Sequence, residues 1–429
     1  MKLWQKDNTE TSNLVDAFTV GRDKEFDVLL APFDVQGNKA QAAMLAKIGV
    51  LTLDEHSALQ AELDNILIEV TNPAFSLPHD VEDIHSYIEL LLTQRVGEAG
   101  KKIHTGRSRN DQVAVDVKLF LRAEILALKD DVKRTFDLLL AKAEENKHKL
   151  IPGYTHLQLA MPSSAGLWLS AYAESLVDDL EMLLAAYNIV NKNPLGSGAG
   201  YGSSFPIDRQ ATTVALGFDA INVSSVYAQM TRGKAEKAVA TGISYIAATL
   251  SRFAYDCCLY LNQNFGFISF PASLTTGSSI MPHKKNPDVF ELIRAKCNRI
   301  QATPNELTLL INNLPSGYHR DMQLTKEILF PALEDLKACL QMTCLMLESI
   351  TVNDHLLEDE KYKYLFTVEA MNELVQQGMS YRDAYRQIGN AVDGGIFAYK
   401  ARNLNHSHIG SITNLRLDLI REGWNKLRF

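Results

Sequence analysis

Apolar side chains recur at three- and four-residue intervals over long stretches of this chain. The clearest stretch runs from Asp111 to about Lys147, contains no Gly or Pro, and repeats Val, Leu, Ile and Phe at that spacing. With a rise of 1.5 Å per residue, such a helix is about 55 Å long. Similar patterns predict long helices over residues 163–190, 231–263, 287–314 and 322–352. Helices that exceed the usual length of roughly 8 to 20 residues are typical of a bundle of nearly parallel rods.

Strand signals are scarce, because alternating runs of Val, Ile and Thr between Asn-Gly or Asp-Gly turns are hard to find. We therefore expect an all-α fold whose central domain, over residues 108–353, is a bundle of five long helices. Shorter helical segments over residues 1–107 and 354–429 predict two further helical domains, as the length of 429 residues also suggests. Pro304 and Pro331 should bend two of the long helices.

Composition narrows the class of protein. The formal net charge of −8 argues against a nucleic-acid partner or an anionic membrane surface, since binding either normally requires a basic patch. The first residues contain no apolar run typical of a signal peptide, and no window resembles a membrane span, so we expect a cytoplasmic protein. The five cysteines are odd in number and form no C-x-x-C motif, which predicts buried free thiols. The apolar outer positions of the long helices predict burial against other subunits.

Several polar segments interrupt the helical pattern. Residues 100–112 place Arg109 and Asn110 directly before the first long helix, which suits an anion site at a helix N-terminus. A solvated basic linker with Asn110 or Asp111 as the N-cap explains the same residues. Residues 194–204 resemble a dinucleotide loop, but the glycine spacing fails at Tyr201 and no strand precedes it, so we interpret them as a turn.

A second pair of polar segments allows two interpretations each. Residues 151–162 place Thr155 and His156 in a loop bounded by prolines, where the histidine is either structural or suited to proton transfer near neutral pH. Residues 317–327 place polar side chains on one helical face, which is either a carboxylate-binding surface or ordinary surface charge. The latter residues are Tyr318, Arg320, Gln323 and Lys326.

The segment from His79 to His85, with the sequence HDVEDIH, contains oxygen and nitrogen side chains but matches no zinc or calcium spacing. A helix start with acidic residues in its first turn is the simpler interpretation. Those acidic residues are Asp80, Glu82 and Asp83.

Residues 277–288, with the sequence GSSIMPHKKNPD, form the most informative polar segment. A serine is too weak an acid to act as a base without help, and Lys284 could fold back to stabilise the alkoxide of Ser278. Glycine and serine suit a loop that closes over a substrate and excludes water. Asn286 and Pro287 then open the next helix.

This loop resembles the signature of the aspartase/fumarase superfamily. The segments EDIHSYIE, HTGRSRNDQVA and PGYTHLQ narrow the resemblance to the argininosuccinate lyase family, over about residues 30 to 345. The resemblance implies cleavage of argininosuccinate to arginine and fumarate without a metal or organic cofactor. It also implies a homotetramer whose five long helices per subunit form a central twenty-helix bundle, with each active site built from three subunits.

Specific residues acquire roles through this resemblance. Ser278 corresponds to the catalytic base on the mobile loop and His156 to the partner acid, although the reverse assignment also fits the sequence. Lys284 and Asn286 correspond to residues that stabilise Ser278 and the intermediate, an aci-carboxylate whose two negative charges require fixed cations and N–H donors. The residues that would bind the carboxylates and the amino-acid end of the substrate are Arg109, Asn110, Thr155, Tyr318, Gln323 and Lys326.

Two departures from the family pattern leave alternatives open. Asp23 stands where the family usually has a substrate-binding serine, and His283 replaces a usual glutamine in a way that resembles adenylosuccinate lyase. A sister lyase acting on adenylosuccinate is therefore one alternative. A catalytically silent structural homologue is another, although the presence of His156, Ser278 and Lys284 argues against it.

Overall fold

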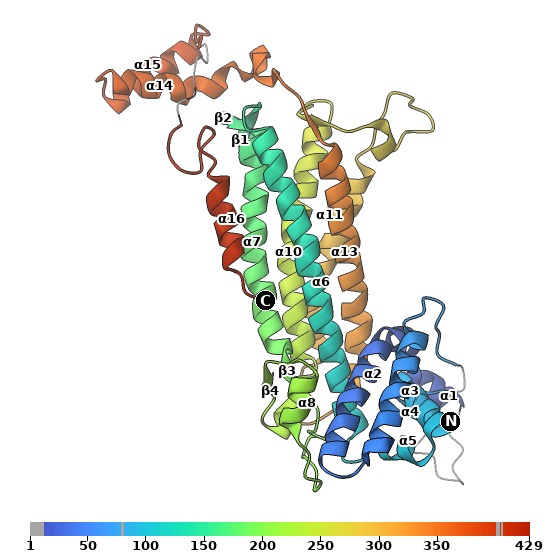
Figure 1. Ribbon diagram of the computed structural model, residues 1–429. Coiled ribbons are helices and arrows are strands. Elements are labelled where there is room, and N and C mark those ends of the chain that lie inside the picture. The colour runs from blue at the N-terminus through green and yellow to red at the C-terminus, as the bar shows by residue number, and fades with distance from the viewer. Residues whose placement is uncertain (1–12, 79–80, 400–403, 405) are drawn as a thin grey trace.

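Long, nearly parallel helices dominate the computed structural model, which describes residues 13–78, 81–399, 404 and 406–429 (Figure 1). Four of the rods are single helices, and the fifth consists of α11 and α12 in succession. This arrangement confirms the predicted all-α class and its five-rod bundle. The rods are α6 (Arg109–Glu145), α7 (Ala165–Val190), α10 (Lys234–Leu261), α11 (Asp288–Ile300) with α12 (Thr303–Leu310), and α13 (Thr325–Ser349).

The two prolines that were expected to bend rods behave differently. The single helix predicted over residues 287–314 is wrong, because the chain leaves the helix after Ile300 and restarts it at Thr303. Pro304 therefore lies in the first turn of α12, where its missing N–H costs nothing. Pro331 lies inside α13, which continues past it.

Five helices precede α6, and the second of them, α2, packs against it. They are α1 (Asn13–Val20), α2 (Asp23–Lys47), α3 (Leu53–Val70), α4 (Ile84–Val96) and α5 (Glu98–Lys102). The apolar faces of α2 to α5 form a separate buried cluster that includes Leu45, Leu59 and Ile88. This cluster fixes α2 and α4 beside the start of α6, which is where the functional side chains of these helices converge.

The Pro-bounded segment before α7 is a β-hairpin rather than the loop that the sequence predicted. Strand β1 (Leu150–Thr155) pairs antiparallel with β2 (Gln158–Ser164). Pro152 pairs with Pro162, and the register shifts between Pro152 and Tyr154. The prolines hid the strands in the sequence, since proline removes a ladder donor. The hairpin needs few donors, because it pairs only with itself and continues directly into α7 through the N-cap Ser164.

Two further strand pairs are very short: parallel β3 (Lys192–Asn193) with β4 (Ala220–Ile221), and antiparallel β5 (Ile268–Ser269) with β6 (Thr351–Val352). Short helices fill the connections between rods. They are α8 (Arg209–Ala215), α9 (Ser225–Met230), η1 (Ala272–Leu274) and η2 (Arg320–Leu324).

The C-terminal region projects beyond the hairpin end of the bundle and then returns. Helices η3 (Leu356–Glu358), η4 (Glu360–Phe366), α14 (Thr367–Gln376) and α15 (Tyr381–Asp393) lie at this end, and α16 (Leu417–Lys426) runs back along α7 (Figure 1). Trp424 of α16 packs on Phe136 of α6 with ring centroids 4.6 Å apart. The last helix is thereby tied to the bundle core.

The cysteines and the apolar outer positions of the rods can now be compared with what the sequence predicted. All five cysteines are free thiols, and four are buried while Cys258 is half-buried. Large apolar side chains remain exposed on the outer faces of the rods, among them Tyr245, Tyr255 and Leu292. Within the described ranges, no helix is both long and apolar enough to cross a membrane.

Candidate active site

The predicted functional residues fall into two groups at opposite ends of the bundle. Asn110 lies in the first turn of α6, whereas His156 lies in the hairpin that follows the other end of the same helix. The 37 residues of α6 span about 55 Å. The first group comprises Arg109, Asn110, Tyr318, Gln323 and Lys326, which line one cleft. The second group comprises Thr155, His156, Ser278, Lys284 and Asn286, and it belongs to the hairpin and to the loop between β5 and α11 at the other end of the bundle (Figure 1).

The first group lines a cleft of about 600 Å³ at the N-terminal end of α6. Five carboxylates and four cationic side chains face this cleft, so its lining is mixed rather than simply basic. The carboxylates are Asp23, Asp27, Glu82, Asp83 and Glu89, and the cations are Arg109, Arg232, Arg320 and Lys326.

A capping box shapes the start of α6 beside the cleft. Ser108, rather than Asn110 or Asp111, is the N-cap, and Asp111 accepts a hydrogen bond from the Ser108 backbone N–H at 2.8 Å. The other carboxylate oxygen of Asp111 accepts from the N–H groups of Gly196 and Gly198, both at 2.9 Å. The glycine-rich segment predicted as a turn therefore wraps onto this helix start. With Asp111 used in the cap, the Asn110 side chain is left facing the cleft.

Arg109 is held in place by α4. Its Nη1 donates to Asp83 Oδ1 at 2.7 Å, and its Nη2 donates to Ser86 Oγ at 3.3 Å. Asp83 is also the N-cap of α4 and accepts from the Ser86 backbone N–H. A helix does start in this segment, as predicted, but it begins at Ile84, so Glu82 and Asp83 precede it instead of lying in its first turn. His79 and Asp80 lie outside the described residues.

The ammonium group of Lys326 forms ion pairs with two carboxylates. Its Nζ lies 2.7 Å from Asp27 Oδ1 and 2.6 Å from Asp23 Oδ1, and the lysine side chain is 4 % exposed. Burial opposes the charge on Lys326, but the carboxylates of Asp27 and Asp23 outweigh it and raise the lysine pKa. Burial and the charge of Asp27 raise the pKa of Asp23 to about 6.

Arg232 is a cleft residue that sequence reasoning missed. Its Nε donates to Glu236 Oε1 at 2.9 Å and its Nη2 donates to the carbonyl of Met322 at 3.0 Å. Its Nη1 is buried and lacks a hydrogen-bond partner in the part of the chain that the structure describes. Arg232 is among the residues that line the cleft, and a guanidinium is suited to binding an anion.

The segment from Tyr318 to Lys326 approaches the cleft as a 3₁₀ helix followed by α13, not as one α-helix. The four residues predicted to share one face, Tyr318, Arg320, Gln323 and Lys326, all line the cleft. Gln323 donates to the carbonyls of Thr19 and Val20, at 3.0 and 3.2 Å, so its amide N–H groups fasten the end of α1.

At the other end of the bundle, His156 and Leu157 form the tip of the hairpin. Both residues have left-handed backbone conformations, with φ of 53° and 58°, and both are exposed. Thr155 pairs with Gln158 directly below them. A two-residue turn of this kind favours Asn or Gly, so non-glycine residues in it store strain, as is frequent at functional sites.

The loop over residues 277–285 is closed at its base by a bridge between Thr276 and Asn286. The Asn286 N–H donates to the Thr276 carbonyl at 2.8 Å, and its side-chain Nδ2 donates to the Gly277 carbonyl at 3.4 Å. Within the loop, Ser278 Oγ accepts from the N–H groups of Ile280 and Met281, at 3.4 and 3.2 Å. In the described structure, Lys284 makes no hydrogen bond to Ser278, so the predicted contact is not formed within one chain.

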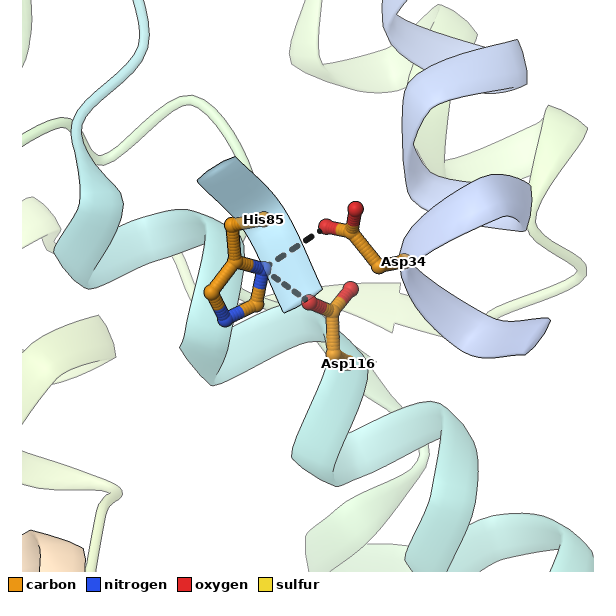
Figure 2. Close-up of side chains that lie close together, drawn as sticks. All are labelled: Asp34, His85 and Asp116. Carbon is orange, nitrogen blue, oxygen red and sulfur yellow. Dashed lines mark hydrogen bonds and ion pairs between the residues drawn. The ribbon is translucent and has the colours of Figure 1, made fainter. Parts of the chain in front are cut away.

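A buried group of three titratable side chains lies behind the cleft. His85 Nδ1 is 2.9 Å from Asp34 Oδ1 and 3.3 Å from Asp116 Oδ2 (Figure 2). These residues come from α4, α2 and α6, far apart in the sequence, which is why no motif revealed them. The spacing of their ligand atoms would allow a metal ion. Only His85 belongs to the segment that was compared with metal motifs in the sequence.

Comparison of the sequence with known proteins identifies an enzyme family. A family model described as "Lyase" matches residues 7–302. Argininosuccinate lyase of Parabacteroides distasonis is 54 % identical over 414 residues, which cover 96 % of this chain and 92 % of the relative. The chain belongs to the argininosuccinate lyase family. The enzyme of that name from Phocaeicola vulgatus is 52 % identical over 419 residues, 98 % of this chain and 94 % of the relative. That of Stenotrophomonas maltophilia is 36 % identical and is covered over 99 % of both chains.

Solved structures show how widely this lyase fold is shared. An EDDS lyase in complex with formate superimposes with a TM-score of 0.74 at 24 % identity, over 97 % of this chain and 81 % of that one. A class II fumarase from Schistosoma mansoni superimposes with a TM-score of 0.73 at 16 % identity, over 95 % and 91 %. At such identities the likeness concerns the fold, which confirms the predicted helical architecture.

Proposed function

We propose that this protein cleaves argininosuccinate to arginine and fumarate. The observation that carries the proposal is the identity of 52–54 % to proteins named argininosuccinate lyase over nearly the whole chain. The four polar segments that contain the candidate residues lie inside the aligned length. Retention of His156, Ser278 and Lys284 in these segments favours an active enzyme over a silent homologue.

In the proposed reaction, Ser278 removes a proton from the succinyl carbon next to a carboxylate. The electron pair of that C–H bond moves onto the carboxylate, giving an aci-carboxylate. Collapse of this intermediate forms the double bond of fumarate and breaks the bond to the guanidino nitrogen, which leaves with arginine after His156 supplies a proton. The N–H groups of Ile280 and Met281 support this role, because they stabilise negative charge on Ser278 Oγ.

The cleft suits the remainder of the substrate. Argininosuccinate carries carboxylates together with a guanidinium and an ammonium group, and the cleft presents both signs of charge. Arg232 and Asn110 offer donors without partners in the described structure, whereas Asp27 and Asp23 offer carboxylates beside Lys326. A lining of one sign would leave half of such a substrate unpaired.

The proposed assembly is a homotetramer with sites shared between chains. Its support is that the two groups of candidate residues lie about one α6 length apart in a single chain, so antiparallel copies are needed to unite them. The exposed apolar side chains on the rods provide surface for such packing. We also retain the division into helical domains over residues 1–107, 108–353 and 354–429 as part of this proposal.

Fumarate release, followed by ultraviolet absorbance, tests the function. Argininosuccinate and adenylosuccinate are offered separately to the folded protein, and release is expected with the first substrate. Release with adenylosuccinate instead would assign the sister activity that His283 suggests. A folded oligomer that releases fumarate from neither substrate would contradict the enzymatic proposal.

A further inference from the structure

A groove of about 430 Å³ lies between α7 and α10, two rods that pack side by side (Figure 1). Its lining comes from these two helices alone, at the three- and four-residue spacing of one helical face on each. Tyr245, Ala248 and Arg252 form part of the α10 wall and are exposed in the single chain. The groove is therefore open to a partner along the middle of the bundle.

Asp179 lies on the α7 side of this groove with one oxygen atom unsatisfied. The residue is 5 % exposed, and its Oδ2 is buried and has no hydrogen-bond partner among the described residues. Burial raises the pKa of Asp179 to about 6. A buried carboxylate is unfavourable unless a cation or a donor reaches it. Asp179 thus lacks a partner that the described part of the chain does not supply.

Arg252, on the α10 side, carries the complementary charge. In the described structure it forms no ion pair or hydrogen bond, although Asp256 lies one turn further along the same helix. Asp256 already accepts from Trp168 Nε1 at 3.0 Å and from the Tyr172 hydroxyl at 2.6 Å. One groove therefore contains an unpaired guanidinium and an unpaired carboxylate that do not pair with each other. Such a surface is self-complementary, because a two-fold axis brings each charge to its opposite twice.

The positions of the two charges along the rods determine how a second copy would lie. The Thr249 hydroxyl is 2.8 Å from that of Ser175 and also interacts with the carboxylate of Asp179, so Asp179 lies level with Thr249. Pairing Asp179 with Arg252 of the partner subunit places the two-fold axis between the levels of Thr249 and Arg252, with the two α10 rods antiparallel. The small side chain of Ala248, close to this axis, allows the rods to approach closely.

The same register agrees with the proposed site shared between chains. In such a pair, Leu261 at the C-terminal end of one α10 faces Ala240 of the other, about 12 Å along the helix from Arg232. Arg232 lines the cleft, and the loop containing Ser278 follows α10 at its C-terminal end. The loop of one copy is thereby carried toward the cleft of the other, although no residue of the loop or the cleft was used to set the register.

We propose that the groove between α7 and α10 binds a second copy of this chain, held by two ion pairs in which Arg252 of each copy contacts Asp179 of the other. This inference rests on the proposed function, because it specifies the rods and the residues through which the antiparallel copies meet. Each Asp179 is incomplete in a single chain and is completed by its counterpart.

Reversing the charge of Arg252 tests the ion pairs. Arg252→Glu sets two carboxylates against each other at both contacts, so the dissociation constant of the assembly should rise at least about 100-fold. Analytical ultracentrifugation over a dilution series measures this, and circular dichroism should show unchanged helical content, since Arg252 is exposed in the single chain. Arg382→Glu makes the same charge change at an exposed arginine of α15 and is the control.

Asp179→Asn tests the other half of each pair without a change of shape. The substitution should raise the dissociation constant roughly 10-fold, because it leaves Arg252 of the partner subunit without a counter-charge. If Asp179 instead stays unpaired in the assembly, removing its charge leaves association unchanged or strengthens it, and either result would overturn the proposal.

Chemical cross-linking tests the register independently of the charges. In the proposed pair, Ala248 lies about 8 Å along the helix from Ala248 of the partner subunit, so Ala248→Cys should give covalent dimers with a short bis-maleimide. Lys234→Cys, on the same helix, lies about 50 Å from its counterpart and should not be linked. Both variants also carry Cys258→Ser, because Cys258 is the native thiol that is half-buried while the other four are buried.

The outcomes separate the interface from the activity. An assembled protein in which Ala248→Cys is not linked would overturn the proposal, as would unchanged association of Arg252→Glu. A wild-type chain with the mass of a monomer would overturn it too and would assign the groove to another partner. Fumarate release by the wild type tests the proposed function separately, so linked copies without release would contradict that function and leave the interface standing.

Discussion

Asn110 and His156 lie at or beyond opposite ends of helix α6, although they are only 46 positions apart in the sequence. Asn110 faces the cleft in the first turn of α6, and His156 is exposed at the tip of the hairpin beyond the last turn. A helix cannot fold back on itself, so these side chains do not meet within one chain. The proposed catalysis therefore depends on how copies of the chain are arranged.

Mixing two inactive variants tests this dependence. Asn110→Ala disables the cleft end and His156→Asn disables the hairpin end, and Asn readily adopts the left-handed conformation at that position. After subunit exchange, roughly a quarter of randomly formed sites should combine two intact ends. We expect fumarate release to recover to a comparable fraction of wild-type activity. Each variant incubated separately is the control, and an absence of recovery despite proven exchange would argue for sites within single chains.

Ser278→Ala should abolish turnover while preserving substrate binding. The hydroxyl accepts two backbone N–H groups inside the loop, and the bridge between Thr276 and Asn286 at the loop base does not involve it. Loss of a proposed base should therefore lower kcat by a factor of at least about 10². Stopped assays for kcat and calorimetry for binding check this expectation. Ser279→Ala, at the neighbouring serine, is the matched control, and near-normal turnover in Ser278→Ala would move the base elsewhere.

Because of Lys118, we expect the free energy of unfolding to increase as the pH rises above 7. Its Nζ is buried among neutral acceptors, donating to Asn222 Oδ1 at 2.6 Å and to the carbonyl of Lys192 at 3.0 Å. Burial lowers the pKa of Lys118 to about 7. The unfolded chain, with the ordinary pKa of 10.5, binds more protons between these values, so unfolding becomes less favourable as pH rises from 7. We expect the free energy of unfolding to gain about 2 kcal/mol between pH 7 and 9 relative to a Lys118→Met variant. Denaturant titrations of both proteins at the two pH values measure this, and parallel profiles would contradict it.

Because of Asp23, we expect a contribution to the free energy of unfolding that decreases as the pH rises from about 4 to 6. The pKa of Asp23 rises to about 6 in the folded protein, whereas it is 3.8 in the unfolded chain. Ionisation of Asp23 therefore leaves the free energy of unfolding nearly unchanged below pH 3.8 and lowers it increasingly up to pH 6, above which the loss is complete. Asp23→Asn should therefore stabilise the protein by about 2 kcal/mol at pH 7.5 and by less at pH 4. Asp54→Asn, which removes an exposed carboxylate in α3, is the control. A gain that does not depend on pH would exclude the ionisation of Asp23 as its cause.

Much of the fold is readable from the sequence, because long helices repeat their apolar positions many times. The rod from Arg109 to Glu145 was predicted to within two residues at each end. The hairpin was missed because its strands contain Pro152 and Pro162 and pair only with each other. Strand signals depend on alternation over several residues, and these strands provide little of it.

The candidate site was predictable where its residues are consecutive and was not where they converge from different helices. The loop containing Ser278 and the segment containing Asn110 are recognisable as short motifs. The group of Asp34, His85 and Asp116 is assembled by packing, and neither its burial nor the close approach of its side chains leaves a trace in local spacing. Arg232 was missed for the same reason, since its free Nη1 becomes evident only when Glu236 and Met322 occupy the other donors.

The unbroken helix α6 fixes both the distance and the rotation angle between the two ends of the bundle. Inserting one residue in its middle would rotate everything beyond it by about 100° and shift it by 1.5 Å, so the hairpin would point away from its present direction. An insertion of seven residues nearly restores the angle but lengthens the rod by about 10 Å. The residue count of this helix is therefore itself a functional property, because it sets both the distance and the angle between the cleft and the hairpin.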